Sequence, residues 1–322
     1  DPSIARSLSQ IIDYLENPSS EKMEQYFRLI RISEEWTGNL VTQKLIGELL
    51  MQAGAYSDAS VLLSSAMNRF SDDTEIARMA TYAQFMCGQW DEVENSAANW
   101  QERTAGRRIG PDLFLASALA AKELFPQAIE VLEFHIVAIE KNPVAFQDAI
   151  GVWAQSLIFL GQIENAYEFL VKHISLHHEL RTIWIDLAGN SLPTQYAWDW
   201  LKKIEGYIAP ENQEEQRDLA EGYLEAWRRT DDSRFRDRAE KIIQDVIAAG
   251  PTDQGVWLLM RAFLMHGSEN EIKAEILYRN AVKLNPGLHR AANNLAMLLS
   301  QRGAELDYAL ELAESAVSWR NQ

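Results

Sequence analysis

The residues best suited to chemistry are the histidines of the segment HISLHHE, which covers residues 173–179. On a helix, His173 and His177 stand four residues apart on one face, a spacing that can hold a metal ion. Glu179 does not lie between them in the HExxH order of metalloproteases, and no third, distant ligand is evident. We therefore interpret the segment as a solvated helix end, and we expect neither a metal nor a cofactor in this chain.

Other catalytic patterns are missing from the sequence. It has no Gly-rich phosphate loop, no G-x-S-x-G nucleophile elbow and no Cys/His nucleophile pair. Acidic runs such as Glu214-Glu215 are typical of solvated helix faces, and nothing selects one carboxylate pair for acid–base work. The single cysteine, Cys87, excludes an intrachain disulfide and does not choose between the cytoplasm and the periplasm. We expect no enzyme activity.

The charge balance and the lengths of the apolar stretches argue against two classes of partner. Asp and Glu total 47 against 30 Lys and Arg, so the formal net charge is −17. An acidic surface repels phosphate backbones, and we therefore expect no nucleic acid partner. The longest apolar stretch, residues 149–160, is too short to span a bilayer, so we expect no direct membrane insertion.

The elements that carry these residues are predicted to be helices. Apolar residues recur at spacings of three and four, and no β-alternating run stands out. Gly54 and Gly88 lie 34 residues apart, and each is followed two positions later by an aromatic residue. Ala239, Ala274 and Ala309 are each 35 residues apart. Such a period, with two helices in each unit, is typical of stacked helix pairs.

Three stretches carry the pattern most clearly: LIGELLMQAGAYSDASVLLSSAM (45–67), LYRNAVKLNP (277–286) and AANNLAMLLSQRGAELDYALELAESAV (291–317). They resemble the tetratricopeptide repeat family. The resemblance implies an all-α fold, an α-α superhelix of antiparallel helix pairs. Small residues that let the paired helices cross closely match the family at Gly47, Ala116, Ala154 and Ala296 in first helices and at Ala66, Ala281 and Ala316 in second helices.

The resemblance divides the chain into four segments. Residues 1–38 lack the repeat pattern and are predicted to form an atypical N-terminal helical cap. Residues 39–179 are predicted to form repeats one to four, and residues 180–215 a degenerate helix pair. Residues 216–322 are predicted to form C-terminal repeats that stop at an inter-repeat turn, from which we expect the chain to be part of a longer protein.

The family implies a protein-interaction function, with a peptide or partner helix bound on the concave face that the first helices line. Carried over by position, the predicted lining is Leu45, Met51, Met79, Tyr82, Phe85, Met86, Phe114, Ile158, Phe159 and Asn294. Met and aromatic residues are enriched at interfaces, and an exposed apolar strip indicates a binding site. The alternative is that tight winding, or the helices before Trp36, covers this strip.

Two further functions stay open from the sequence. The chain could be a structural spacer or self-association arm of a larger, membrane-linked assembly. It could also position substrate for a catalytic domain outside this chain. Positions equivalent to Asn294 in earlier repeats hold apolar residues, so a family asparagine ladder for a peptide backbone is not predicted. Several tryptophans at helical spacing are interpreted as packing between repeats: Trp36, Trp90, Trp153, Trp184, Trp227 and Trp257.

Overall fold

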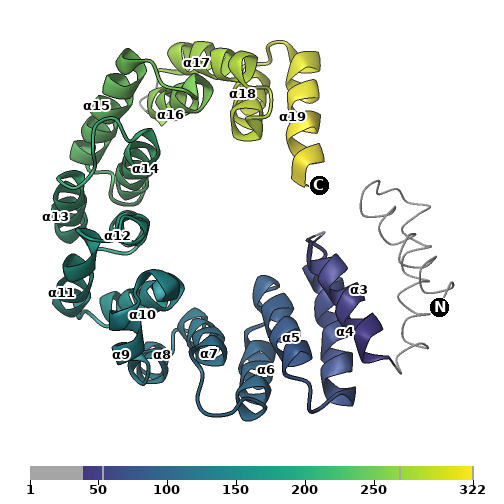
Figure 1. Cartoon of the computed structure of the whole chain (residues 1–322). Helices are drawn as coiled ribbons and strands as arrows, with labels where there is room; N and C mark the ends of the chain where they lie inside the picture. Colours follow the sequence, from purple (N-terminus) through teal and green to yellow (C-terminus); the bar gives the residue numbers. More distant parts are fainter. Residues whose placement is uncertain (1–38, 53, 268–269, 321–322) are drawn as a thin grey trace. The chain divides into compact units, whose positions relative to one another are not determined.

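The computed structural model describes residues 39–52, 54–267 and 270–320, and over these ranges the chain forms α-helices, one short 3-10 helix and no strand (Figure 1). The all-α prediction is confirmed for these residues. The predicted N-terminal cap, residues 1–38, lies outside the described ranges and so does Trp36. The chain divides into two compact units, Asp1–Leu160 and Gly161–Gln322. The predicted boundaries after residues 38, 179 and 215 stay predictions.

The described part of the first unit contains three antiparallel helix pairs, followed by two short helical segments and the helix α10. Its elements are α3 (Leu40–Gln52), α4 (Tyr56–Arg69), α5 (Thr74–Met86), α6 (Trp90–Glu102), α7 (Ile109–Ala121), α8 (Phe125–Glu133), α9 (Ile136–Lys141), η1 (Val144–Phe146) and α10 (Gln147–Phe159). Figure 1 shows the first helices α5 and α7 in one layer and the second helices α6 and α8 in the other.

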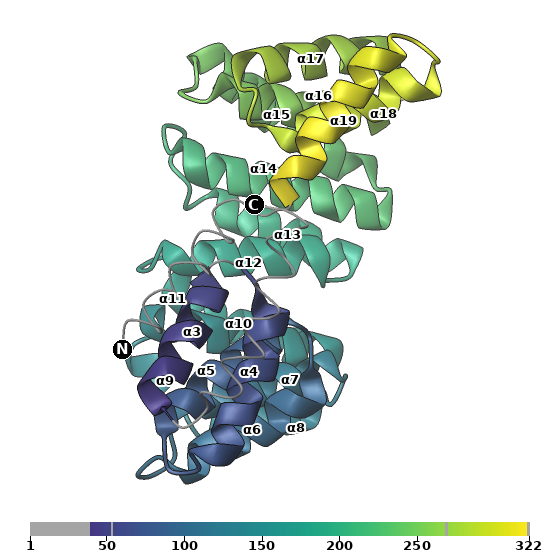
Figure 2. The same cartoon turned by 90° about the vertical axis from the view of Figure 1, so that its right-hand side faces the viewer.

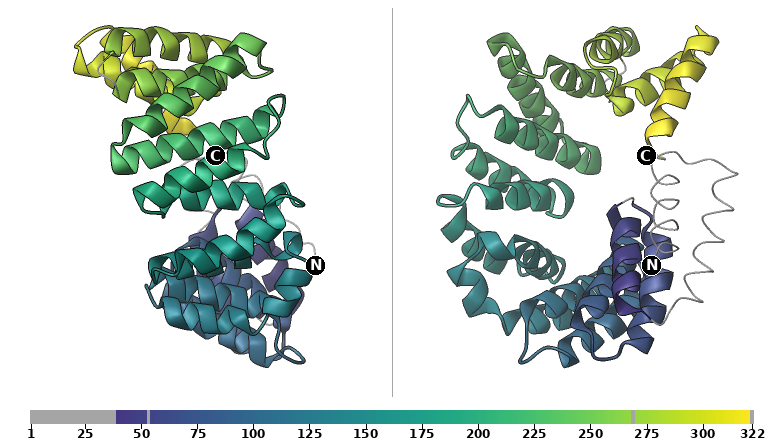
Figure 3. Two further views of the ribbon diagram at one scale, coloured as in Figure 1. Left: turned by 90° about the vertical axis from the view of Figure 1, so that its left-hand side faces the viewer. Right: turned by 45° about the vertical axis from the view of Figure 1, so that its right-hand side comes forward.

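In the second unit, α11 is followed by four antiparallel helix pairs within the described ranges. The elements are α11 (Ile163–Ile174), α12 (Glu179–Asn190), α13 (Thr194–Glu205), α14 (Gln213–Thr230), α15 (Ser233–Ala249), α16 (Gln254–Gly267), α17 (Glu271–Leu284), α18 (His289–Gln301) and α19 (Leu306–Arg320). The even-numbered first helices form one layer, and the stacked pairs can be followed from the side in Figure 2 and Figure 3.

Small residues at the helix crossings explain the close packing of each pair. A Cβ atom on Gly47 would lie only 2.5 Å from Cδ2 of Leu63, so the Leu63 side chain of α4 fills the space that a larger residue on α3 would need. The predicted small residues Ala116, Ala154, Ala296, Ala66 and Ala281 are all buried. Ala316 is only half-buried.

The turn inside a pair repeats one hydrogen-bonding scheme. Gly54 and Gly88 end their first helices with φ of 73° and 66°, a left-handed conformation that glycine adopts without strain. In the third pair the same position holds Glu123, with φ of 61°. In each turn the next residue donates its backbone N–H to the carbonyl five positions earlier: Ala55 to Leu50 at 2.9 Å, Gln89 to Gln84 at 3.0 Å and Leu124 to Leu119 at 2.8 Å.

The core of the first unit contains buried polar groups that join three helices. The amide of Gln84, on α5, donates to the Ser64 hydroxyl of α4 at 2.9 Å, and the Ser96 hydroxyl of α6 donates to the Gln84 oxygen at 2.6 Å. Because both ends of the Gln84 side chain are paired, it can be buried without losing its hydrogen bonds.

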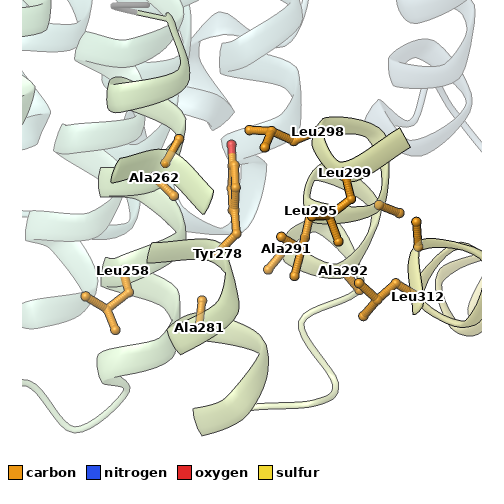
Figure 4. Close-up of a cluster of buried hydrophobic side chains, with 13 residues drawn as sticks. Leu258, Ala262, Tyr278, Ala281, Ala291, Ala292, Leu295, Leu298, Leu299 and Leu312 are labelled. Atoms are coloured by element: carbon orange, nitrogen blue, oxygen red, sulfur yellow. The ribbon is translucent and has the colours of Figure 1, made fainter. Parts of the chain in front are cut away.

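The core of the second unit has two distinct parts. In the first, the indole N–H of Trp184 donates to the carbonyl of Trp200 at 2.8 Å, and the two rings lie 4.4 Å apart. Beside them α12 and α14 meet at two glycines, since a Cβ on Gly189 would lie 3.0 Å from the Gly222 carbonyl oxygen. In the second part, Tyr278 packs between α16 and α18 in a cluster of alanines and leucines (Figure 4).

Candidate binding surfaces

The first-helix layer of the first unit leaves large apolar side chains open to solvent. Leu45, Tyr82, Met86 and Phe159 from the predicted lining are 40%, 37%, 43% and 55% exposed. They come from α3, α5 and α10, all of which are first helices. Surface apolar residues found singly are ordinary, but several on one layer of helices form a candidate interaction surface.

Two residues of the predicted lining do not face solvent. Met79 is 3% exposed and packs in the core that α3, α4 and α5 share, and Ile158 is 6% exposed. Met51 is partly buried against the same core as Met79. Repeat position identifies the right helix but not the direction of each side chain, because consecutive residues on a helix point about 100° apart. The predicted lining is therefore corrected by removing Met79 and Ile158.

Three predicted lining residues meet in an aromatic cluster between α5 and α7. Phe114 lies 6.3 Å from Tyr82 and 5.3 Å from Phe85, and both contacts are edge-to-face. Phe85 also meets Trp90 edge-to-face at 5.7 Å. Phe85 and Phe114 are half-buried. Such contacts stabilise beyond buried area alone, so this cluster fixes the orientation of the exposed Tyr82 ring.

Phe159 contacts an aromatic residue of the third pair. Its ring stacks on that of Phe125 with centroids 4.8 Å apart and planes 8° from parallel. Leu124 and Leu160, next to these two residues in the sequence, are 36% and 39% exposed. The turn that precedes α8 and the end of α10 thus expose further apolar surface.

Cys87 adds no reactive group to this surface. It follows Met86 at the end of α5, and burial, together with the nearby Asp58 carboxylate, raises the pKa of its thiol. The thiol therefore stays protonated at neutral pH, and the protonated form is a poor nucleophile.

Asn294, the remaining predicted lining residue, belongs to the second unit and lines a pocket there. The pocket has a volume of about 340 Å³. Its lining comes from α14, α16, α17 and α18 and from the turn after α14: Trp227, Arg228, Asp231, Phe263, His266, Tyr278, Asn294 and Met297. The Asn294 amide donates to the Tyr278 hydroxyl at 3.4 Å. Burial raises the pKa of Tyr278 to about 12, so its phenol is neutral.

The tryptophan interpretation is confirmed at three positions, and Trp90 and Trp227 are half-buried. Trp153, Trp184 and Trp257 are buried, as core packing requires. Trp227 also lines the pocket described above. The sequence held a signal for this pocket. Trp227 lies near the end of a first helix, and Phe263 and Met297 lie on the next two first helices.

The histidine segment spans the end of α11 and the start of α12. The His173 and His177 rings lie 6.3 Å apart, and Nδ1 of His178 is 3.5 Å from a Glu179 carboxylate oxygen. In the described ranges, no group of three or more His, Cys, Asp or Glu side chains is placed to hold a metal ion. A bilayer-spanning helix is likewise not found there.

The paired helices, their repeated turns and the small residues at their crossings define a tetratricopeptide-like helical solenoid. No family model matches the sequence, and no curated protein does. Among solved structures, the chain is similar to a tetratricopeptide repeat protein from Parabacteroides merdae, at 14% identity and TM-score 0.44, over 80% of this chain and 97% of that one.

Two further solved structures are of the same kind. The C-terminal part of a TPR repeat-containing protein from Cytophaga hutchinsonii matches at 12% identity and TM-score 0.39, over 85% of this chain and 94% of that one. The TPR2AB domain of yeast Sti1, solved in a pHSP90 complex, matches at 19% identity and TM-score 0.32, over 76% of this chain and 89% of that one.

Proposed function

We propose that this chain is a protein-interaction module whose first unit binds an apolar segment of a partner protein. The observation that carries the proposal is the set of exposed apolar side chains on first helices, above all Tyr82, Met86 and Phe159. Met adapts to a partner's shape, and a held aromatic ring loses little conformational entropy on binding. We term Leu45, Tyr82, Met86 and Phe159 the apolar strip.

The partner segment that fits this strip is an amphipathic helix or an extended segment with spaced apolar side chains. Both bind by placing successive large side chains against an apolar surface. The acidic balance of the chain, −17, favours basic residues on the partner's polar side.

The test compares a variant with two glutamates on the strip with a control that carries one glutamate on a second helix. Met86→Glu combined with Phe159→Glu places charge on the strip, while Val61→Glu places it on α4, where Val61 is 63% exposed. The immobilised proteins are exposed to an extract of the source cells, and captured proteins are quantified. We expect one partner to be captured by the wild type and by Val61→Glu, and to fall at least about tenfold with the double variant.

The same variants separate the alternative functions. Concentration-dependent dimers that disappear with the double variant would show that the strip joins copies of this chain, as a self-association arm requires. Capture that is equal for all three proteins would contradict a binding role for the strip. All three substituted positions are exposed, so we expect each variant to keep the helix content of the wild type. Circular dichroism checks this.

A further inference from the structure

The pocket of the second unit has mainly apolar walls with a few polar groups. Trp227 and Phe263 are half-buried, and Met297 is 43% exposed, so these side chains line the pocket and still meet solvent. The His266 and Tyr278 rings meet edge-to-face, with their centroids 6.2 Å apart. A volume of about 340 Å³ is at the small end of the range for ligand pockets and accommodates one bulky side chain with part of its backbone.

Arg228, the cation on the pocket wall, is already engaged. Its guanidinium lies 3.0 Å from Glu225 and sits over the Phe263 ring at 5.6 Å. An arriving anion would therefore have to compete with an existing carboxylate for the same guanidinium. This arrangement stabilises the Phe263 wall and does not favour an acidic ligand.

Asp231, the carboxylate on the pocket wall, differs from Arg228 because it has no partner of opposite charge within the described ranges. It follows the last residue of α14 and is exposed, with φ of 56°. None of the ion pairs formed within the described ranges includes it. Glu221, which lies earlier on α14, also forms no ion pair within the described ranges.

We propose that this pocket binds a bulky apolar side chain of a partner peptide that carries Lys or Arg beside it, with Asp231 pairing the basic group. The apolar walls recognise the anchor, and Asn294 orients the Tyr278 hydroxyl at its edge. The free rim carboxylate and the net charge of −17 both favour a basic neighbour. In an extended peptide that neighbour lies within about two residues of the anchor, at about 3.3 Å per residue.

The chain offers matched variants for this site. Met297→Arg fills the pocket mouth with a charge, and Ile276→Arg adds the same charge on α17, where Ile276 is 54% exposed. Asp231→Asn removes the rim charge and keeps the left-handed turn, because Asn tolerates that conformation. Phe159→Glu disables the apolar strip of the first unit and leaves this pocket unchanged.

The experiment selects a phage-displayed library of random peptides on the full chain and on each variant. We expect enrichment of peptides with Trp, Phe, Leu or Met next to Lys or Arg on the wild type, on Ile276→Arg and on Phe159→Glu. A synthetic peptide from that set should bind at least about tenfold more weakly to Met297→Arg. On Asp231→Asn the apolar residue should stay enriched while the basic preference disappears.

Three results would overturn the proposal: no peptide enriched on the wild type, the same peptides enriched on Met297→Arg, or an acidic preference beside the anchor. Loss of enrichment on Phe159→Glu would place the peptides on the strip of the first unit and would also reject the pocket. Failure of the strip in the capture experiment leaves this selection unaffected, so the two proposals stand or fall separately.

Discussion

Oδ2 of Asp112 lies 2.8 Å from Nε2 of His135, and both side chains are buried. The same oxygen accepts a hydrogen bond from Nε of Arg107 at 2.6 Å. Asp112 belongs to the first turn of α7, and His135 stands at the break between α8 and α9. The contact therefore connects the start of a first helix to the point where its second helix is interrupted.

We expect Asp112→Ala to destabilise the protein by about 3 kcal/mol, because it leaves His135 buried without its acceptor. Arg107→Ala should cost about 1 kcal/mol or less, since Arg107 is partly exposed and the His135 contact survives. Urea unfolding followed by circular dichroism measures both. Equal losses would show that Arg107 and not His135 is the important partner of Asp112.

Glu123 is the turn residue that most clearly limits stability. With φ of 61° it occupies a left-handed position that glycine holds in other pairs. We expect Glu123→Gly to raise the free energy of unfolding by about 1 kcal/mol, because it relieves the contact between Cβ and the backbone. The reverse change, Gly54→Glu, should lower it by a similar amount, since no atom near Gly54 would clash with a new Cβ. Thermal unfolding of both variants checks the pair, and a destabilised Glu123→Gly would refute the explanation.

Glu205 makes the second unit sensitive to acid. Burial raises its pKa, but hydrogen bonds from Arg238, Lys202 and Tyr223 outweigh burial and hold the pKa below its usual 4.5. A carboxyl whose pKa is lower in the folded state stabilises the fold above its unfolded pKa and loses that contribution as pH falls. We expect stability to decline below about pH 4.5.

The corresponding variant is Glu205→Gln. It should lower stability at neutral pH by about 1–3 kcal/mol and weaken the acid dependence. The control is Glu75→Gln, whose ion pair with Arg78 leaves both side chains 48% exposed and should matter far less. Unfolding at a series of pH values measures both, and an unchanged acid profile for Glu205→Gln would contradict the assignment.

The glycine contact between α12 and α14 predicts a steric effect. A Cβ on Gly222 would lie 2.4 Å from Cγ2 of Ile185 and 3.2 Å from Cδ2 of Leu201. We expect Gly222→Ala to cost about 1–3 kcal/mol through overpacking. Gly206→Ala serves as the control, because its Cβ would meet only the Lys203 carbonyl at 3.4 Å. Equal stability of the two variants in chemical unfolding would mean that the helices separate without cost.

The helix pairs could be predicted because their signals are local. Glycines such as Gly54 and Gly88 end first helices, and alanines such as Ala116 and Ala281 occupy the crossings. These requirements act within one pair and recur with the period. Glu123 breaks the pattern by sequence but not by structure, since the turn hydrogen bonds hold it in the glycine conformation.

The binding surfaces were less predictable because they depend on helix rotation and on several pairs together. Met79 is on the predicted helix, but its side chain faces the core. The pocket around Asn294 needs side chains from four helices. Gly189 and Gly222 are equally non-local, since Gly189 is explained by the Gly222 backbone and Gly222 by the side chains of Ile185 and Leu201.

The meeting of Gly189 and Gly222 also limits how this chain can be rearranged. Helix pairs that contact only their neighbours are natural units of duplication, deletion and recombination. A new helix pair inserted after α13 would separate α12 from α14. Each of the two glycines would then lie opposite an ordinary side chain or an empty space. Because a Cβ at position 189 would lie 3.0 Å from the opposing carbonyl oxygen, a larger residue there would push the two helices apart. We expect chimeras that exchange whole pairs to fold when joined elsewhere and to fail when this junction is split.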